Sequence, residues 1–295
     1  MHRCNASQME CTVSSMDSAD TTSQIAPALE PPKAIFDEHR RSFATARVIL
    51  ALVLREMSTQ YGRSPGGYIW AILEPIGMIV ILSVGFSLLV RMPSLGNGFV
   101  LFYASAYLVF SHYKSIEKAT NKAIAFSRPL LFYPAVTWLD ALLARIILNT
   151  LTNLLNMILI IGGVIFLFAP GIVPYYPPMI EAVALATLLG VGVGTLNCFL
   201  MGVSPLYTTL WKMATRPLMI ASGVLYIMED LPDAARDVLW WNPLIHITAM
   251  FRTGIYPYYH AQFLSPMYVV AIGLGSFAIG LLFLNSYNKN IINNE

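Results

Sequence analysis

Four polar side chains follow one another at helical spacing inside an apolar stretch of the chain. Arg145, Asn149, Asn153 and Asn156 stand at positions i, i+4, i+8 and i+11, which predicts one shared face of a helix. Such groups are costly in lipid unless they are paired, so this face must meet protein or water. Two interpretations follow. The stripe could make interhelical hydrogen bonds, or it could form the polar wall of a substrate path.

A second stripe is aromatic. Tyr103, Tyr107 and Phe110 occupy positions i, i+4 and i+7 of an apolar segment. An aromatic stripe is typical of helix packing. Tyrosine can also stack on a sugar ring with its apolar face and form hydrogen bonds through its hydroxyl group. The stripe therefore indicates either packing or a path for sugars.

Motifs for enzymatic chemistry are missing from the sequence. There is no GxxxxGK[ST] phosphate loop, and the histidines and the cysteines Cys4, Cys11 and Cys198 are scattered without metal-ligand spacing. Gly190, Gly192 and Gly194 alternate inside an apolar helix with no preceding strand, which favours close helix packing over nucleotide binding. The sequence therefore predicts a protein that is not an enzyme and that has no metal site and no cofactor of its own.

The elements that position these stripes must lie in a membrane. Of the 295 residues, 56% are hydrophobic and 12% are charged, and the mean hydropathy is +0.61. Soluble domains carry about twice that charged fraction. A soluble core could not hide so much apolar surface, which excludes soluble enzymes and nucleic-acid binders.

An all-α integral membrane fold with six transmembrane helices is therefore predicted. A bilayer needs roughly 20 apolar residues per helix. The expected spans are residues 68–90, 99–113, 138–168, 180–202, 217–228 and 267–286. Most lysines and arginines outside the spans fall on the side of the N-terminus, so we expect both termini in the cytoplasm.

Other segments do not fit a plain bundle. Residues 1–44 form a polar tail that we expect to be disordered, and residues 287–295 form a short C-terminal tail. Residues 47–61 mix apolar and charged positions and are too short to span, which predicts an amphipathic helix in the cytoplasmic interface. Residues 114–136 form a basic cytoplasmic loop. Residues 229–265 contain apolar, proline-broken stretches that predict a re-entrant helical pair.

The segment from residue 45 to residue 290 resembles a known family. Its first span is entered through YGRSPGGYIWAILEPI, which follows Leu54-Arg55-Glu56 and is similar to the entry of type 2 ABC-transporter permeases. The C-terminal half carries RPLMIASGVLYIMEDLP, WWNPLIHITAMFR and GIYPYY in the order of the polysaccharide-export branch. The sequence most resembles the permease of group 2 capsular polysaccharide exporters. It departs at Ala249, where we expect the family often to carry an acidic residue.

The resemblance implies an assembly and a set of functional residues. The chain would form a homodimer around a channel, and two separate ATP-binding cassette subunits would hold ATP and Mg. The coupling contact with these subunits would use Glu117, Lys118, Asn121, Lys122, Phe126 and Arg128. The substrate path would use Tyr103, Tyr107, Phe110, Arg145, Asn149, Asn153 and Asn156. The cytoplasmic gate would use Arg55, Glu56 and Arg63, and the outer gate Trp241, Asn242, Pro243, His246 and Arg252.

The resemblance also implies a function. The chain would lie in the bacterial inner membrane and export lipid-linked capsular polysaccharide from the cytoplasm, together with periplasmic and outer-membrane capsule export proteins. Export of another glycolipid, such as an O-antigen or a teichoic acid, is the alternative within the family. A drug or small-lipid exporter and a membrane glycosyl- or acyltransferase are alternatives outside that branch.

Overall fold

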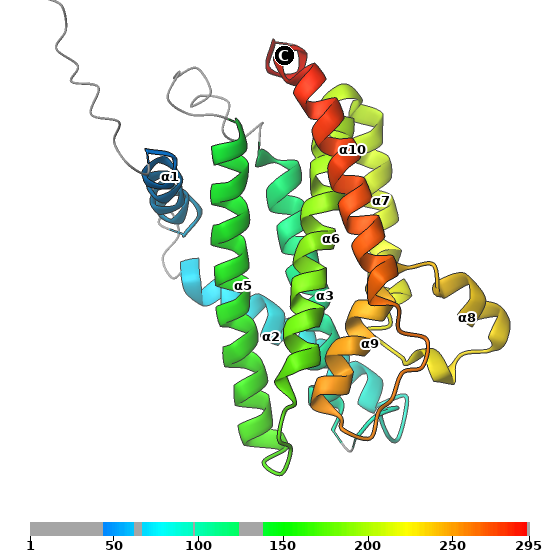
Figure 1. Ribbon diagram of the computed structural model, residues 1–295. Helices are drawn as coiled ribbons and strands as arrows, with labels where there is room; N and C mark the ends of the chain where they lie inside the picture. Colours follow the sequence, from blue (N-terminus) through cyan, green and yellow to red (C-terminus); the bar gives the residue numbers. More distant parts are fainter. Residues whose placement is uncertain (1–43, 62–66, 97, 124–137, 294–295) are drawn as a thin grey trace, which may run out of the picture. The chain divides into compact units, whose positions relative to one another are not determined.

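The described part of the chain is built from helices alone (Figure 1). The computed structural model describes residues 44–61, 67–96, 98–123 and 138–293. In chain order the elements are α1 (Ala44–Tyr61), α2 (Gly67–Ser87), α3 (Phe99–Asn121), α5 (Trp138–Phe168), α6 (Tyr176–Val203), α7 (Pro205–Ala221), the 3-10 turn η1 (Met228–Asp230), α8 (Asp233–Leu239), α9 (Pro243–Ile255) and α10 (Pro266–Asn293). The predicted all-α class is confirmed for these residues.

Four of the helices are long and apolar enough to cross a bilayer. The apolar stretches are Ile69–Ser87, Leu139–Phe168, Tyr176–Val203 and Pro266–Ser286. They lie in α2, α5, α6 and α10, at the first, third, fourth and sixth of the predicted spans. The chain is therefore an integral membrane protein.

The helices at the other two predicted spans have different bounds from those expected. α3 starts at Phe99, as expected, but continues to Asn121, so the first part of segment 114–136 extends this helix. α7 contains Pro217, which the prediction placed at a helix start, and ends at Ala221. The left-handed φ of +70° at Gly223 turns the chain away just after it.

Glycines allow α6 to pack closely against two neighbours. A Cβ atom at Gly190 would lie 3.1 Å from the Tyr113 carbonyl oxygen, and one at Gly194 would lie 2.9 Å from the Glu117 carbonyl oxygen, both on α3. A Cβ atom at Gly192 would collide with the backbone of Gly273 on α10. The three glycines thus serve helix packing, as the sequence predicts.

The segment between α7 and α10 contains two short helices, α8 and α9 (Figure 1). α9 packs against α3, α6 and α10, and nearly all of its side chains are buried. In Figure 1, α9 lies at the end of the bundle opposite the C-terminal end of α10. A helical pair thus forms inside residues 229–265.

Candidate functional site

A cavity of about 720 Å³ lies between α1, α2, α3 and α5. Its wall contains the polar stripe of α5 and part of the aromatic stripe of α3. From these stripes and from α1, it is lined by Glu56, Tyr107, Phe110, Arg145, Asn149, Asn153 and Asn156. The structure thus brings together residues predicted for the substrate path and one residue predicted for the cytoplasmic gate.

The amides of the polar stripe join α5 to its neighbours. Asn153 Nδ2 donates to Ser115 Oγ on α3 (2.9 Å) and to the Asn149 carbonyl oxygen (2.7 Å). Asn156 Nδ2 donates to the Ala71 carbonyl oxygen on α2 (2.9 Å). Interhelical hydrogen bonding is therefore present, and the same side chains face the cavity. Contact with a substrate stays a prediction.

The structure separates the three aromatic residues. Tyr107 and Phe110 line the cavity, but Tyr103 does not. Tyr103 is buried, and its ring centroid lies 5.2 Å from that of Phe102 and 5.4 Å from that of Phe86. Packing therefore accounts for Tyr103, while Tyr107 presents its ring to the cavity.

Three lysines, two on α3 and one at its C-terminal cap, also face the cavity. Lys114, Lys118 and Lys122 all line it, together with Glu74 of α2. Sequence analysis assigned Lys118 and Lys122 to the coupling contact and gave Lys114 and Glu74 no site role. The four-residue spacing was a usable signal, because it places all three lysines on one face once the helix is known to continue to Asn121.

An ion pair crosses from α1 to α5 at the cavity wall. Arg145 donates to Glu56 Oε1 from Nη2 (2.7 Å) and from Nε (3.0 Å). Its Nη1 donates to the Ala119 carbonyl oxygen on α3 (3.3 Å). Of the other predicted gate residues, Arg55 is exposed, and Arg63 lies outside the described residues.

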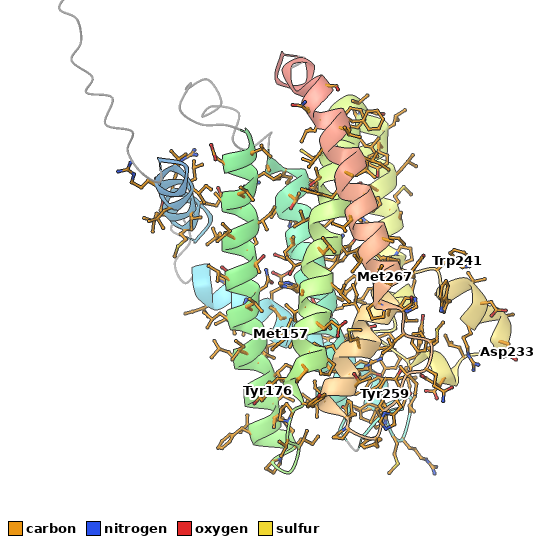
Figure 2. All side chains as sticks on the ribbon, in the orientation of Figure 1. Met157, Tyr176, Asp233, Trp241, Tyr259 and Met267 are labelled. Atoms are coloured by element: carbon orange, nitrogen blue, oxygen red, sulfur yellow. The ribbon has the colours of Figure 1, made fainter. Side chains whose placement is uncertain are left out.

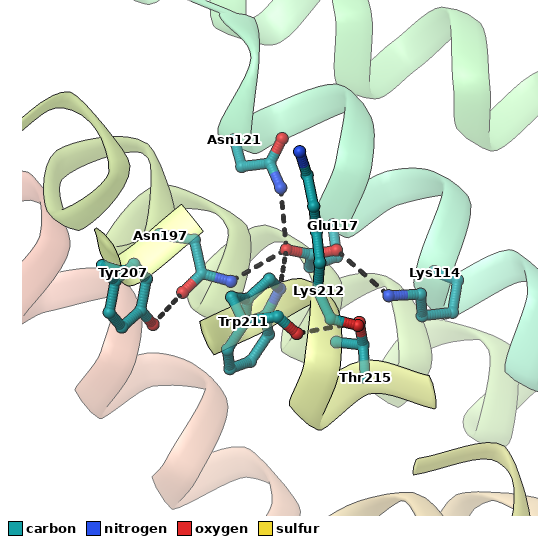
Figure 3. A network of polar contacts seen from close by, with 8 residues as sticks. All are labelled: Lys114, Glu117, Asn121, Asn197, Tyr207, Trp211, Lys212 and Thr215. Carbon is teal, nitrogen blue, oxygen red and sulfur yellow. Dashed lines mark hydrogen bonds and ion pairs between the residues drawn. The ribbon is translucent and has the colours of Figure 1, made fainter. Parts of the chain in front are cut away.

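A buried carboxylate connects α3, α6 and α7 (Figure 3). Glu117 Oε1 accepts from Asn121 Nδ2 (2.9 Å), Asn197 Nδ2 (2.8 Å) and Trp211 Nε1 (3.0 Å). Tyr207 OH donates to Asn197 Oδ1 (2.7 Å). Glu117 Oε2 lies 3.7 Å from Lys114 Nζ. The spacing of Glu117 alone could not reveal the whole network, because Asn197 and Trp211 are far from it in sequence.

The predicted coupling residues thus fall into three groups. Glu117 and Asn121 take part in the Glu117 network inside the bundle. Lys118 and Lys122 are exposed and line the cavity. Phe126 and Arg128 lie outside the described residues. Their contact with a partner subunit stays a prediction.

The predicted outer-gate residues hold the end of α7 against α9. Asn242 caps α9 by accepting from Leu244 N (3.1 Å), and its Nδ2 donates to the Ala221 carbonyl oxygen (2.8 Å). Pro243 follows at the first helical position. The buried Arg252 donates from Nη1 to the carbonyl oxygens of Gly223 and Tyr226 (2.8 Å each) and from Nη2 to that of Val224 (3.1 Å).

An aromatic cluster lies beside this contact. His246 Nε2 donates to the Trp240 carbonyl oxygen (2.9 Å), and Tyr268 OH donates to the Trp241 carbonyl oxygen (2.7 Å). Trp241, labelled in Figure 2, is 68% exposed, and its ring centroid lies 6.4 Å from that of Tyr268 on α10. In the adjoining loop, burial and the Glu229 carboxylate raise the pKa of Tyr259. Tyr259 OH donates to Glu229 Oε2 (3.0 Å), so it acts as a neutral donor.

No group of three or more His, Cys, Asp or Glu side chains is placed to hold a metal ion in the part of the chain that the structure describes. The arrangement instead offers amide, aromatic and cationic groups around an open space. These groups suit the binding of a polar, oxygen-rich molecule.

Comparison with known proteins supports this interpretation. The chain is 27% identical over 250 residues to the capsule polysaccharide export inner-membrane protein CtrC of Neisseria meningitidis serogroup B, covering 83% of this chain and 92% of the relative. It is 28% identical over 245 residues to the polysialic acid transport protein KpsM of Escherichia coli, covering 82% and 94%. It is 24% identical over 248 residues to the capsule polysaccharide export inner-membrane protein BexB of Haemophilus influenzae, covering 83% and 92%. The model of the ABC-2 type transporter family matches residues 47–256. The chain belongs to the ABC-2 type transporter family.

Proposed function

We propose that the chain is the transmembrane subunit of an ATP-driven exporter that moves lipid-linked capsular polysaccharide out of the cytoplasm across the inner membrane. The observation that carries the proposal is the cavity between α1, α2, α3 and α5. Its amides can bond to sugar hydroxyls, and the face of Tyr107 can stack on a sugar ring. The printed names of the relatives support the same function.

The proposed topology has six transmembrane helices: α2, α3, α5, α6, α7 and α10. α1 would lie in the cytoplasmic interface, and α8 and α9 would form a re-entrant pair on the outer side. The even number of crossings and the lysines and arginines on the side of the N-terminus support cytoplasmic termini. The cavity then faces the cytoplasmic side, where a newly made glycolipid would enter.

The proposed assembly is a homodimer with two copies of a separate ATP-binding cassette subunit, which would hold ATP and Mg. The exposed apolar side chains of α7, such as Leu206, Leu210 and Met213, provide a surface for a second copy or for lipid. Periplasmic and outer-membrane capsule export proteins would receive the polysaccharide.

Coupling is proposed to act through the end of α3 and the segment that follows it, within residues 114–136. ATP-driven closure of the partner subunits would push on this segment. The Glu117 network would carry the displacement to α6 and α7, because its hydrogen bonds join the three helices.

The test is co-purification of the chain with an ATP-binding cassette subunit of the same host, followed by an ATPase assay with and without the lipid-linked capsule of the host. Stable association and stimulation by that glycolipid are expected. Undecaprenyl-linked O-antigen and a detergent alone serve as comparison substrates. Failure of any ATP-hydrolysing subunit to associate would overturn the proposal, and stimulation by O-antigen alone would assign a different glycolipid.

A further inference from the structure

The Glu56–Arg145 ion pair lies within the contact that holds α1 in place. α1 packs chiefly against α5, and the pair crosses that contact. Both side chains are largely buried, at 9% exposure for Glu56 and 11% for Arg145. Opposite charges in such a place attract more strongly than on an open surface, because water screens them less. The pair therefore contributes to keeping α1 against the bundle.

The cavity beside this pair contains more cationic than acidic groups. Its acidic side chains are Glu56 and Glu74. Its cationic side chains are Lys114, Lys118, Lys122 and Arg145. Such a lining attracts an anion, and an oxyanion would find both lysine and arginine donors there.

We propose that Arg145 recognises an oxyanion at the membrane-anchored end of the substrate, and that this oxyanion displaces Glu56 and thereby releases α1 from α5. The inference rests on the proposed function, since it concerns the substrate of the same cavity. Glu56 is then the counterion of Arg145 in the absence of substrate, and α1 is a gate that responds to the charge of the substrate.

The geometry of the guanidinium group explains why the two partners compete. Glu56 occupies the Nε–Nη2 edge, and the Ala119 carbonyl oxygen takes a donor of Nη1. A phosphate or carboxylate that binds the Nε–Nη2 edge with two oxygens must therefore replace Glu56. The three lysines favour this exchange, because an oxyanion that enters the cavity can accept hydrogen bonds from them as well as from Arg145.

Released α1 would still remain at the membrane. Leu50 and Leu54 are each 59% exposed on the side of α1 that faces away from the bundle. Exposed leucines on an amphipathic helix insert into the interface of a bilayer. We therefore expect α1 to slide along the membrane surface and to widen the access to the cavity without leaving the membrane.

The test uses the full chain in nanodiscs of phosphatidylcholine and three probes: dodecyl phosphate, dodecyl maltoside and inorganic phosphate. Hydrogen exchange of the backbone amides in residues 47–58 reports the release of α1. Dodecyl phosphate should speed this exchange about tenfold, because it offers the anchored oxyanion. The neutral maltoside and free phosphate at the same concentration should leave it unchanged.

Substitutions separate the roles of the two charges. Glu56→Gln should give rapid exchange without any probe and should bind dodecyl phosphate more tightly, because the competitor is gone. Arg145→Gln should weaken binding about tenfold, the usual loss for one charge-assisted contact. Because Arg145→Gln removes the Arg145 partner of a largely buried carboxylate, the double variant Glu56→Gln/Arg145→Gln is measured too and should bind equally weakly. Glu181→Gln and Arg91→Gln are matched controls, since both residues are exposed and lie outside the cavity.

Several results would overturn the inference. Among them are unchanged exchange with dodecyl phosphate, an equal response to the maltoside, and undiminished binding by both variants that lack Arg145. If inorganic phosphate alone speeds the hydrogen exchange, the ligand of the site is a free anion. That result would overturn the proposal that the oxyanion is anchored to a lipid. Glycolipid-stimulated ATPase activity without release of α1 would overturn this inference but not the proposed function. Release of α1 in a chain that binds no ATP-hydrolysing subunit would instead remove the proposed function.

Discussion

At the scale of single residues, Arg252 shows how backbone carbonyl oxygens, in place of a carboxylate, can accept hydrogen bonds from a buried guanidinium group. Its guanidinium group donates to three backbone carbonyl oxygens in the loop after α7 and lies 4.2 Å above the ring of Phe102. The three residues that carry these carbonyl oxygens lie outside any helix, in the bend at Gly223. One side chain thus provides hydrogen-bond donors for three carbonyl oxygens in the loop that follows α7.

Arg252→Ala should therefore lower the free energy of unfolding by about 3 kcal/mol, since several buried acceptors lose their donor at once. Arg91→Ala, at an exposed position, should change it by less than about 0.5 kcal/mol. Thermal unfolding of the purified chain in detergent compares the two variants. Equal melting temperatures would contradict the structural role of Arg252.

Tyr103 and Tyr107 allow a second test at this scale, because one is packed and the other lines the cavity. Tyr107→Leu should reduce polysaccharide export severalfold at unchanged stability, since a sugar ring loses its stacking surface. Tyr103→Leu should instead lower the melting temperature, since it disturbs the contacts with Phe86 and Phe102. Surface capsule and thermal unfolding measured on both variants distinguish the roles, and a reversal of the two effects would refute the assignment.

At the scale of elements, the close packing of α6 predicts how a glycine-to-alanine substitution changes stability. Gly192→Ala should destabilise the protein by about 1–3 kcal/mol, because the new methyl group meets the backbone of α10. Gly162→Ala in α5 should be neutral or mildly stabilising, because a Cβ atom there meets nothing within 4 Å. The yield of folded chain and its melting temperature measure the difference. Unchanged yield and melting temperature in both variants would mean that α6 and α10 pack less closely than the structure shows.

The Glu117 network joins α3, α6 and α7, so substitution of Glu117 should affect the packing of all three helices. Glu117→Ala leaves the donors of Asn121, Asn197 and Trp211 without their common acceptor, which should cost about 2–4 kcal/mol of unfolding free energy. Glu117→Gln keeps an acceptor oxygen and should cost less than half of that. If the network also transmits coupling, Glu117→Gln should fold well yet reduce the stimulation of ATPase activity by glycolipid. Wild-type stimulation in that variant would limit Glu117 to a structural role.

At the scale of the whole molecule, hydropathy predicted the long helices well and the polar contacts poorly. The 31 residues of α5 match the expected span, because apolar residues predominate along the whole segment and no proline interrupts it. Hydropathy did not place the end of α3, because Lys114, Glu117 and Lys118 make this stretch polar, and the partners of Glu117 on α6 and α7 are invisible to a local pattern. For the same reason, sequence periodicity put the asparagines of α5 on one face but could not show that Lys114, Lys118 and Lys122 lie across the cavity from them.

The glycine contacts of α6 have a further consequence for experiments on this protein. Where glycines let backbones approach closely, few side-chain atoms between the helices can rearrange, so we expect α3, α6 and α10 to move together as a stiff unit. α1 and α7 are joined to their neighbours by side-chain contacts such as Glu56–Arg145 and Trp211–Glu117, so we expect them to shift against that unit. Spectroscopic labels intended to follow a transport cycle therefore belong in pairs, with one on α1 or α7 and a reference on α10. Pairs placed within the stiff unit should report constant separations throughout the cycle.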